Sequence, residues 1–387
     1  MAKIAVPEAI AVLVGTIIGA GVFTLPYVAV NSGIVITIIW LVIVTSIIVF
    51  LHLSFGEVVL RTKDDFRLPG YVGHYLNPPA KKLVLLTTFL TFGFSLLIYL
   101  LLGSQFLGVI INFFFQDNIF PSGLLVIFLW LCLSLIVLTN GNKLSKLNLY
   151  LSFLLLFLFI AIIIFIFPHF SIENLNFFNF QNSWGWLIPY GTIFFALNGM
   201  AAIPEAAKVL EKRQVNKRKL KQVIIIGTII PAFCYLGFMI AVAGVSGERT
   251  TLEAIEGLKG ILGDSIILLG AGLGFLAVVT SYLTFSSYIK NSFITDFGWS
   301  SFISYFLVII GPLLVFCLQL ESLIKLVSFL GGMLGGFEGI MILLVLKKSK
   351  EQSDLEPSYQ VPLNKIIMAV LITAFIIGAL CQTFLAY

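Results

Sequence analysis

The sequence predicts an all-α protein that crosses a membrane many times. Of its 387 residues, 59% are hydrophobic and 11% are charged, and the mean hydropathy is +1.09. Soluble domains are about 45–50% apolar and about 25% charged. The apolar residues form long runs between short loops, and two of these runs contain residues that break helices. Together these observations predict a polytopic helical bundle with two broken spans.

The apolar runs define eleven expected spans, because each crossing needs about 20 apolar residues. The first five lie near residues 4–30, 33–60, 83–115, 121–140 and 146–168. Six more lie near residues 186–208, 221–247, 264–293, 300–319, 321–347 and 363–387. We expect the first span to stay as a helix, since it is too long for a signal peptide and no cleavage site precedes a soluble domain.

The basic residues predict the orientation. A cytoplasmic N-terminus places 20 of the 23 Lys and Arg residues on the inner side and leaves Arg249, Lys259 and Lys325 outside. The most basic inner loop covers residues 208–221. The positive-inside rule therefore predicts a multi-pass protein of the cytoplasmic membrane with the N-terminus inside and, after eleven spans, the C-terminus outside. The net charge of +5 does not indicate nucleic acid as a partner, because the basic residues are confined to loops.

The first span is interrupted by clustered glycines. Residues 15–23 read Gly-Thr-Ile-Ile-Gly-Ala-Gly-Val-Phe, and Pro26 follows. A helix opened in this way leaves backbone N–H and C=O groups unpaired, which lipid tolerates only where the break faces protein or a water-filled cavity. The segment is therefore a candidate binding site.

The sixth span contains a second interruption. Residues 194–205 read Phe-Phe-Ala-Leu-Asn-Gly-Met-Ala-Ala-Ile-Pro-Glu, and Asn-Gly and Pro both weaken a helix. The breaks lie five spans apart, which predicts two inverted five-span repeats, residues 1–168 and 186–347, within one membrane domain. The eleventh helix, residues 363–387, lies outside the repeats. Paired broken spans are typical of substrate and ion sites in secondary transporters.

Other classes of site find no support in the residues. No GxxxxGK[ST] loop is present, so ATP-driven transport by this chain alone is not expected. No nucleophile–base pair or metal cluster lies in the spans, so we expect neither an enzyme nor a metal site. No cofactor is expected besides a coupling ion, H⁺ or Na⁺. The cysteines each lie in a different apolar run and are expected to be packing residues: Cys132, Cys234, Cys317 and Cys381.

Several segments carry a resemblance to a known family. Residues 15–27 are similar to the unwound first helix of the amino acid/auxin permease family, within the amino acid–polyamine–organocation superfamily, and most closely to its prokaryotic members. Residues 51–62, 68–71 and 195–205 also resemble that family. The resemblance implies the LeuT-type fold of five plus five helices, usually with an eleventh. It also implies import of amino acids by alternating access, with helices 1, 2, 6 and 7 rocking against helices 3, 4, 8 and 9.

The two breaks provide the candidate substrate site. Backbone N–H groups at the first break would bind a carboxylate, since an outer half-helix begins there. Carbonyl groups at the second break would bind an ammonium group, and Phe194 or Phe195 would act as a gate. The expected substrate-binding residues are Thr16, Gly19, Ala20, Gly21, Phe195, Ala196 and Asn198. As an alternative, Gly15 and Gly19 form a GxxxG packing face.

Candidates for ion coupling fall into two groups. The resemblance implies a sodium site where hydroxyl groups of the eighth span, on Thr280, Ser281 and Thr284, meet the first break near Ile18. Alternatively, these hydroxyls bond to carbonyls of their own helix. For protons, one candidate is Glu338, an acid inside an apolar span. The other is Lys146: the resemblance implies that a lysine of this helix can occupy the sodium position, and the alternative is that Lys146 anchors the inner end of its helix.

Three further residues have two possible roles each. His52, inside the second span, either titrates or faces a neighbouring helix. Glu57 is an intramembrane acid that Arg61 at i+4 can neutralise. Glu205 is either functional or a first-turn cap that pairs with Lys208.

The sequence predicts a substrate that is a neutral or aromatic amino acid, because no carboxylate or lysine belongs to the expected substrate pocket that the two breaks form. Alternatives are a carrier of divalent metal ions or other small solutes with the same fold, and a membrane sensor that binds an amino acid without moving it. The lipid bilayer is the other expected partner. The oligomeric state stays open, and a monomer is compatible with the sequence.

Overall fold

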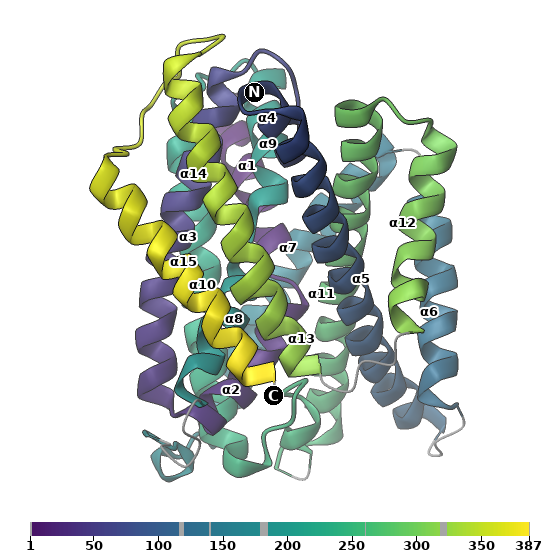
Figure 1. Ribbon diagram of the computed structural model, residues 1–387. Helices are drawn as coiled ribbons and strands as arrows, with labels where there is room; N and C mark the ends of the chain where they lie inside the picture. Colours follow the sequence, from purple (N-terminus) through teal and green to yellow (C-terminus); the bar gives the residue numbers. More distant parts are fainter. Residues whose placement is uncertain are drawn as a thin grey trace.

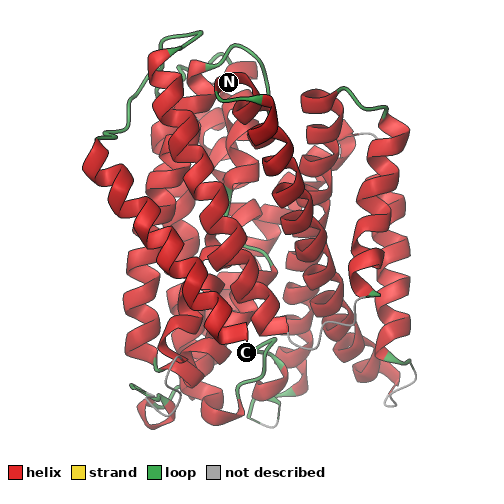
Figure 2. Cartoon of the chain, viewed as in Figure 1, coloured by secondary structure: helices red, strands yellow, loops and turns green. Residues whose placement is uncertain are grey.

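The computed structural model describes residues 2–115, 120–138, 141–178, 185–259, 261–317 and 323–386. In these ranges the chain is a bundle of helices joined by loops (Figure 2). The helices are α1 (Ala2–Ile17), α2 (Leu25–Ser32), α3 (Ile34–Arg61), α4 (Leu68–Tyr75), α5 (Pro78–Phe115), α6 (Ser122–Val137), α7 (Gly141–Ile166), α8 (Ile188–Leu197), α9 (Ile203–Lys212), α10 (Lys219–Ser246), α11 (Asp264–Asn291), α12 (Ser301–Phe316), α13 (Leu323–Phe329), α14 (Gly336–Glu351) and α15 (Lys365–Ala386).

Apolar segments long enough to cross a membrane confirm the membrane class. Within the described ranges, seven helices are long and apolar enough to cross a membrane. The bent pair Ala5–Ile17 and Ala20–Ser32 makes an eighth span. Three shorter apolar helices, Ser122–Val137, Phe153–His169 and Ser301–Phe316, lie where the fourth, fifth and ninth spans are expected. The exact number of eleven crossings and the inverted repeat stay predictions.

The broken spans lie inside the bundle. In the most apolar window of the span Gly185–Lys212, which contains α8 and α9, 78% of residues are buried, against 11% for Lys365–Gln382 of α15. In Figure 1, α6 and α12 lie together at one edge, and α3 and α15 lie at the opposite edge. Outer helices carry exposed apolar side chains such as Phe302 and Ile366, which suit contact with lipid.

The first break falls at the predicted glycines. Helix α1 ends at Ile17, a short 3-10 helix η1 (Ala20–Thr24) follows, and α2 continues at an angle of 47° to α1. Gly19 joins them in an extended conformation. A Cβ at Gly19 would lie 2.3 Å from Oγ of Ser281 on α11, so glycine lets the break approach α11 without moving that hydroxyl.

The second break falls at Asn198 and Gly199. Asn198 ends α8 in an extended conformation, the 3-10 helix η5 (Met200–Ala202) follows, and α9 begins at Ile203. Pro204 lies in the first turn of α9, where a helix tolerates proline because that turn needs no N–H partner. The sequence prediction of two broken spans is confirmed at both positions.

The two breaks touch each other. A Cβ at Gly21 would lie 2.8 Å from Cα of Ala196, a distance that no real Cβ contact tolerates. Likewise, a Cβ at Gly199 would lie 2.6 Å from Cγ1 of Ile17. The missing side chains therefore let the unwound segments of two distant spans meet inside the bundle.

Candidate functional site

Tyr235 of α10 connects the two breaks. Its hydroxyl oxygen lies 2.5 Å from the carbonyl oxygen of Ile17 and 3.0 Å from that of Ala196. Both carbonyls lie where a helix stops, so they lack the N–H partner that a continuing helix would provide. A tyrosine hydroxyl has one proton to donate. Tyr235 can thus satisfy the two carbonyls only by sharing that proton between them.

His52 of α3 satisfies the second break from the other side. The backbone N–H of Gly199 donates to Nε2 of His52 at 3.1 Å, and Nδ1 lies 2.9 Å from Oγ1 of Thr228. Since Nε2 accepts, the network assigns the proton of the neutral ring to Nδ1. The ring is fully buried. Of the two roles considered for His52, the structure supports contact with neighbouring elements.

The residues expected at the carboxylate end of the substrate lie together. Gly19, Ala20 and Gly21 are buried at the start of η1, beside the second break. Thr16 is also buried, but its hydroxyl donates to the carbonyl of Val12 within α1 at 2.9 Å. The backbone of Gly19, Ala20 and Gly21, and not the Thr16 hydroxyl, therefore supplies the polar groups available for a carboxylate at this break.

The residues expected at the ammonium end divide into two sets. Ala196 is buried against the first break, and Asn198 is half-buried with its side-chain oxygen accepting from the N–H of Met200. Phe195 is half-buried, and its ring centroid lies 6.5 Å from that of Tyr99. Phe194 is fully buried and packs against Phe375 of α15. Phe195 is thus the better placed of the two gate candidates.

The hydroxyl groups expected at a sodium site lie on α11 beside the first break. Ser281 is fully buried and faces Gly19, and its hydroxyl interacts with that of Tyr99 instead of a carbonyl of its own helix. Thr280 donates to carbonyls of its own helix, and Thr284 donates to the carbonyl of Thr280. Ile18 still donates its N–H to Val14 within the last turn of α1. Ser281 is therefore the hydroxyl that the structure leaves available.

The proton candidates are Glu338 of α14 and Lys146 of α7. Glu338 is 4% exposed in the first turn of α14. It lines a small cavity with Asn198 and Met200 of the second break, Thr88 and Thr91 of α5, and other side chains. Lys146 belongs to α7 near its start, but its side chain lies outside the described part of the chain. The prediction for Lys146 therefore stays a prediction.

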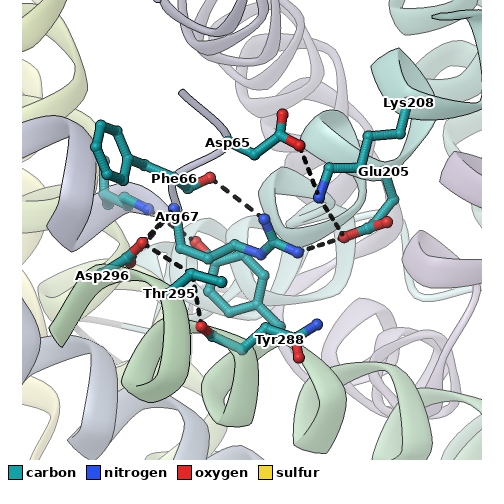
Figure 3. A network of polar contacts seen from close by, with 10 residues as sticks. Asp65, Phe66, Arg67, Glu205, Lys208, Tyr288, Thr295 and Asp296 are labelled. Carbon is teal, nitrogen blue, oxygen red and sulfur yellow. Dashed lines mark hydrogen bonds and ion pairs between the residues drawn. The ribbon is translucent and has the colours of Figure 1, made fainter. Parts of the chain in front are cut away.

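A network of charged residues lies beyond this cavity (Figure 3). Arg67, which precedes α4, pairs with Glu205 of α9, and its guanidinium lies 5.7 Å from the ring centroid of Tyr288 on α11. Lys208 lies 4.0 Å from Glu205 and 3.4 Å from Asp65. Glu205 therefore has both Lys208, the expected partner, and Arg67, which the sequence did not predict.

Asp296 ties the network to the end of α11. Its carboxylate accepts from the backbone N–H of Arg67 at 3.0 Å, from that of Gly70 at 3.3 Å and from the Ser292 hydroxyl at 2.9 Å. It thereby caps the N-terminus of α4, where unpaired N–H groups favour a negative charge. Through Arg67, this inner network joins α4 and α9 to the end of α11.

Glu57 belongs to a separate structural cluster. Its carboxylate is fully buried and pairs with Arg61 at 2.7 Å, as the i+4 spacing predicts. It also accepts the N–H of Val361, at 2.5 Å, from the loop between α14 and α15. Arg61 lies on α3 beside Glu57, and the bond to Val361 holds the loop against α3, which confirms the pairing role.

Sequence reasoning missed Tyr235, Arg67 and Asp296. Tyr235 is one of 12 tyrosines and lies within an apolar run, so no local pattern marks it. For Arg67 a signal existed, since it directly precedes Leu68-Pro69 at a helix start. Its partners Glu205 and Asp296 lie 138 and 229 residues away, so the pairing itself was not readable.

A solved structure has the same fold. Mhp1, a nucleobase-cation-symport-1 family transporter in a closed conformation with bromovinylhydantoin bound, superposes with a TM-score of 0.69 and 13% identity. The match covers 98% of this chain and 90% of that one. The fold is therefore that of a LeuT-type transporter, which agrees with the fold class predicted from the sequence.

Sequence comparisons assign the family. "Glutamine transporter 2" of Aliivibrio fischeri (strain ATCC 700601 / ES114) is 25% identical over 356 residues, 90% of each chain. The model of the tryptophan/tyrosine permease family matches residues 4–382. The protein is thus a membrane transporter and not an enzyme, while the amino acid/auxin permease assignment stays a prediction. This chain belongs to the tryptophan/tyrosine permease family.

Proposed function

We propose that the protein imports a neutral or aromatic amino acid across the cytoplasmic membrane by alternating access. The observation that carries the proposal is the contact between the two breaks at Gly21 and Ala196. This contact supports a site in which backbone N–H groups of the first break and backbone carbonyls of the second both reach the substrate. An α-amino acid carries a carboxylate and an ammonium group on one carbon, so it needs such donors and acceptors close together.

The polar contacts of Tyr235 support a specific arrangement. Its hydroxyl is hydrogen-bonded to the carbonyl oxygens of Ile17 and Ala196. These oxygens are acceptors suited to a substrate ammonium. An ammonium has three donors against the single donor of a tyrosine hydroxyl. In the proposal, the substrate ammonium donates to one of the two carbonyls. The hydroxyl proton of Tyr235 then serves the other carbonyl alone.

Aromatic side chains beside the breaks favour an apolar substrate side chain. Phe195 lies near Tyr99, and the ring of Phe285 lies 5.5 Å from that of Tyr99. The family name refers to tryptophan and tyrosine, and the name of the curated relative refers to glutamine. All three amino acids have uncharged side chains, which suits an aromatic and apolar surrounding.

The inner network supplies the cytoplasmic gate in this proposal. Arg67 connects α9, the inner half of the second broken span, with the end of α11 through Asp296. Separating α9 from α11 requires the Arg67–Glu205 pair to break. The basic loops next to this network agree with a cytoplasmic location of the N-terminus and, after an odd number of crossings, an outer C-terminus.

The driving force in this proposal is an H⁺ or Na⁺ gradient. A sodium ion would bind Ser281 and backbone carbonyls of the first break, close to Ile18 and Thr280. Thr284 remains a candidate ligand of the sodium ion. Lys146 remains a candidate for occupying the sodium position in its place. For protons, the candidate is Glu338.

Uptake into liposomes tests the proposal. The purified protein is reconstituted, and the vesicles are loaded with unlabelled tryptophan, tyrosine or glutamine. Entry of the labelled amino acid by counterflow, which needs no ion gradient, is then measured. We expect counterflow for at least one of them and none for lysine or glutamate. Absence of counterflow with every amino acid in a full panel would reject the proposed substrate class.

A further inference from the structure

Glu338 lines a small cavity, which is named the chamber. The volume of the chamber is about 20 Å³, and a water molecule needs roughly 10–15 Å³ of such space. The lining side chains come from α3, α4, α5, η5, α11 and α14 and from the second break: Phe55, Leu68, Thr88, Thr91, Phe92, Asn198, Met200, Ala201, Phe285, Tyr288 and Glu338. The chamber holds about one water molecule and is too small for an amino acid.

No cationic side chain lines the chamber. Oε1 of Glu338 has no hydrogen-bond partner, and Thr91 is the side chain that interacts with the carboxyl group. The other titratable group among the lining residues is the phenol of Tyr288, whose oxygen accepts the N–H of Leu68. Arg67 lies at the Tyr288 ring and is engaged by Glu205. An ionised carboxylate at Glu338 would therefore be buried without a counter-charge.

Two other buried acids, Glu57 and Asp296, have partners. Glu57 has Arg61 and the N–H of Val361. Asp296 receives two backbone N–H groups and two hydroxyls. Burying an ionised carboxylate without such compensation is unfavourable enough that the group neutralises instead. Glu338 differs from both because its chamber accommodates the neutral acid.

The chamber is lined both by residues of the second break and by Leu68, the neighbour of Arg67 in the proposed gate. On one side, Asn198 and Met200 belong to the second break. On the other side, Leu68 follows Arg67 directly and donates its N–H to Tyr288. A π-helical segment, η9 (Leu330–Gly335), ends just before α14 and Glu338, and π-helical turns inside helices often mark functional positions. Glu338 thus lies between the two regions that must change together during transport.

We propose that Glu338 is the proton-binding site that couples transport to the H⁺ gradient. The proposal rests on the function proposed above and names its coupling ion. In each cycle the carboxylate binds one proton from outside to form the neutral acid, and it returns that proton to the cytoplasm as the carboxylate. The neutral acid is compatible with the chamber, because its O–H can donate to the hydroxyl oxygen of Thr91, whose own proton goes to the carbonyl of Thr87.

Coupling follows from the difference between the two protonation states. The closed chamber favours the neutral acid, whereas a chamber opened to water stabilises the carboxylate. A ligand that binds one conformation more tightly shifts the equilibrium toward it. Protonation therefore favours closure, and opening of the Arg67–Glu205 gate to the cytoplasm favours proton release.

Two measurements on reconstituted protein separate coupling from transport. Counterflow of the transported amino acid reports binding and conformational exchange without a gradient. Accumulation driven by an acidic exterior, together with a pH-sensitive dye inside the vesicles, reports proton movement. For Glu338→Gln, which mimics the neutral acid, we expect counterflow to persist. We expect accumulation driven by pH to be lost, along with the internal acidification that the amino acid causes in the wild type.

Glu253→Gln is the matched control. Glu253 is also a buried carboxylate with an unpartnered Oε1, but it lies in the loop between α10 and α11 and does not line the chamber. We expect this variant to keep both counterflow and pH-driven accumulation. Glu338→Asp retains a carboxylate and is expected to keep part of the pH-driven accumulation.

Three results would overturn the coupling proposal while leaving the transport function intact. These are full pH-driven accumulation by Glu338→Gln, wild-type accumulation driven by Na⁺ alone, and wild-type transport without acidification inside the vesicles. The last two use the wild type, so they decide the question even if the variant does not fold. Absence of wild-type counterflow with all amino acids would instead reject the transport proposal.

Discussion

The N–H of Gly199 donates a hydrogen bond to Nε2 of His52 at 3.1 Å. Gly199 is the point at which the second span stops being a helix, and His52 lies in the middle of α3, 147 residues earlier in the chain. A histidine inside a membrane span thus serves as the acceptor for a broken helix. Because Nε2 must be unprotonated for this bond, the contact argues against His52 as a mobile proton carrier.

Replacing His52 should destabilise the protein. His52→Leu removes the acceptor and leaves the N–H of Gly199 buried without a partner, which costs about 1–3 kcal/mol. We expect a lower midpoint of thermal unfolding in detergent and weaker transport. Thr228→Val, which removes only the partner of Nδ1, should have the smaller effect. An unchanged midpoint in His52→Leu would show that the bond does not support the break.

Tyr235→Phe should impair transport more than stability alone explains. The variant loses the hydroxyl that serves both Ile17 and Ala196, and each neutral hydrogen bond contributes about 0.5–1.5 kcal/mol. We expect weaker substrate binding in counterflow, because the two carbonyls lose the group that positions them. Tyr282→Phe on α11 is the control, since Tyr282 is equally buried and its hydroxyl interacts with Ser134 of α6. Equal counterflow affinities in the two variants would contradict the role of Tyr235.

The contact between the breaks depends on glycine at position 21. Gly21→Ala places a methyl group about 2.8–2.9 Å from atoms of Ala196, and overpacking costs about 1–3 kcal/mol. We expect reduced uptake for Gly21→Ala and none for Gly21→Leu, with membrane insertion retained in both. Gly272→Ala is the control, because nothing lies within 4 Å of the added Cβ. Normal uptake by Gly21→Leu would exclude the first break as the site.

Arg67→Gln should open the cytoplasmic side. Loss of about 1–3 kcal/mol from the closed state corresponds to about 5–150-fold in the ratio of open to closed molecules. A cysteine placed at Ala201, in a background without the four native cysteines, reports access to the chamber. We expect faster modification by an impermeant thiol reagent from the cytoplasmic side. Lys208→Gln serves as the control, because Lys208 lies 4.0 Å from Glu205 and both side chains are partly exposed.

Local chemistry explains why both breaks were predictable. Gly19 adopts an extended conformation, Asn198 ends a helix, and Pro204 begins one, and each behaviour follows from the residue type itself. The pairing of Glu57 with Arg61 was predictable for the same reason, since i and i+4 lie on one face of a helix. The apolar run around Glu338 identifies it as an unusual acid. Its chamber could not be predicted, because the lining residues come from elements far apart in the sequence.

The sequence by itself determined the membrane class, the approximate spans and the two positions where helices break, because these depend on hydropathy and on neighbouring residues. Only the tertiary structure decided that Tyr235 joins both breaks, that His52 accepts from Gly199, and that Arg67 meets Glu205 and Asp296. A freed backbone group or a buried charge accepts any suitable partner within about 3 Å. The choice among many tyrosines, histidines and acids is made by packing between segments up to 229 residues apart, and no local pattern encodes it.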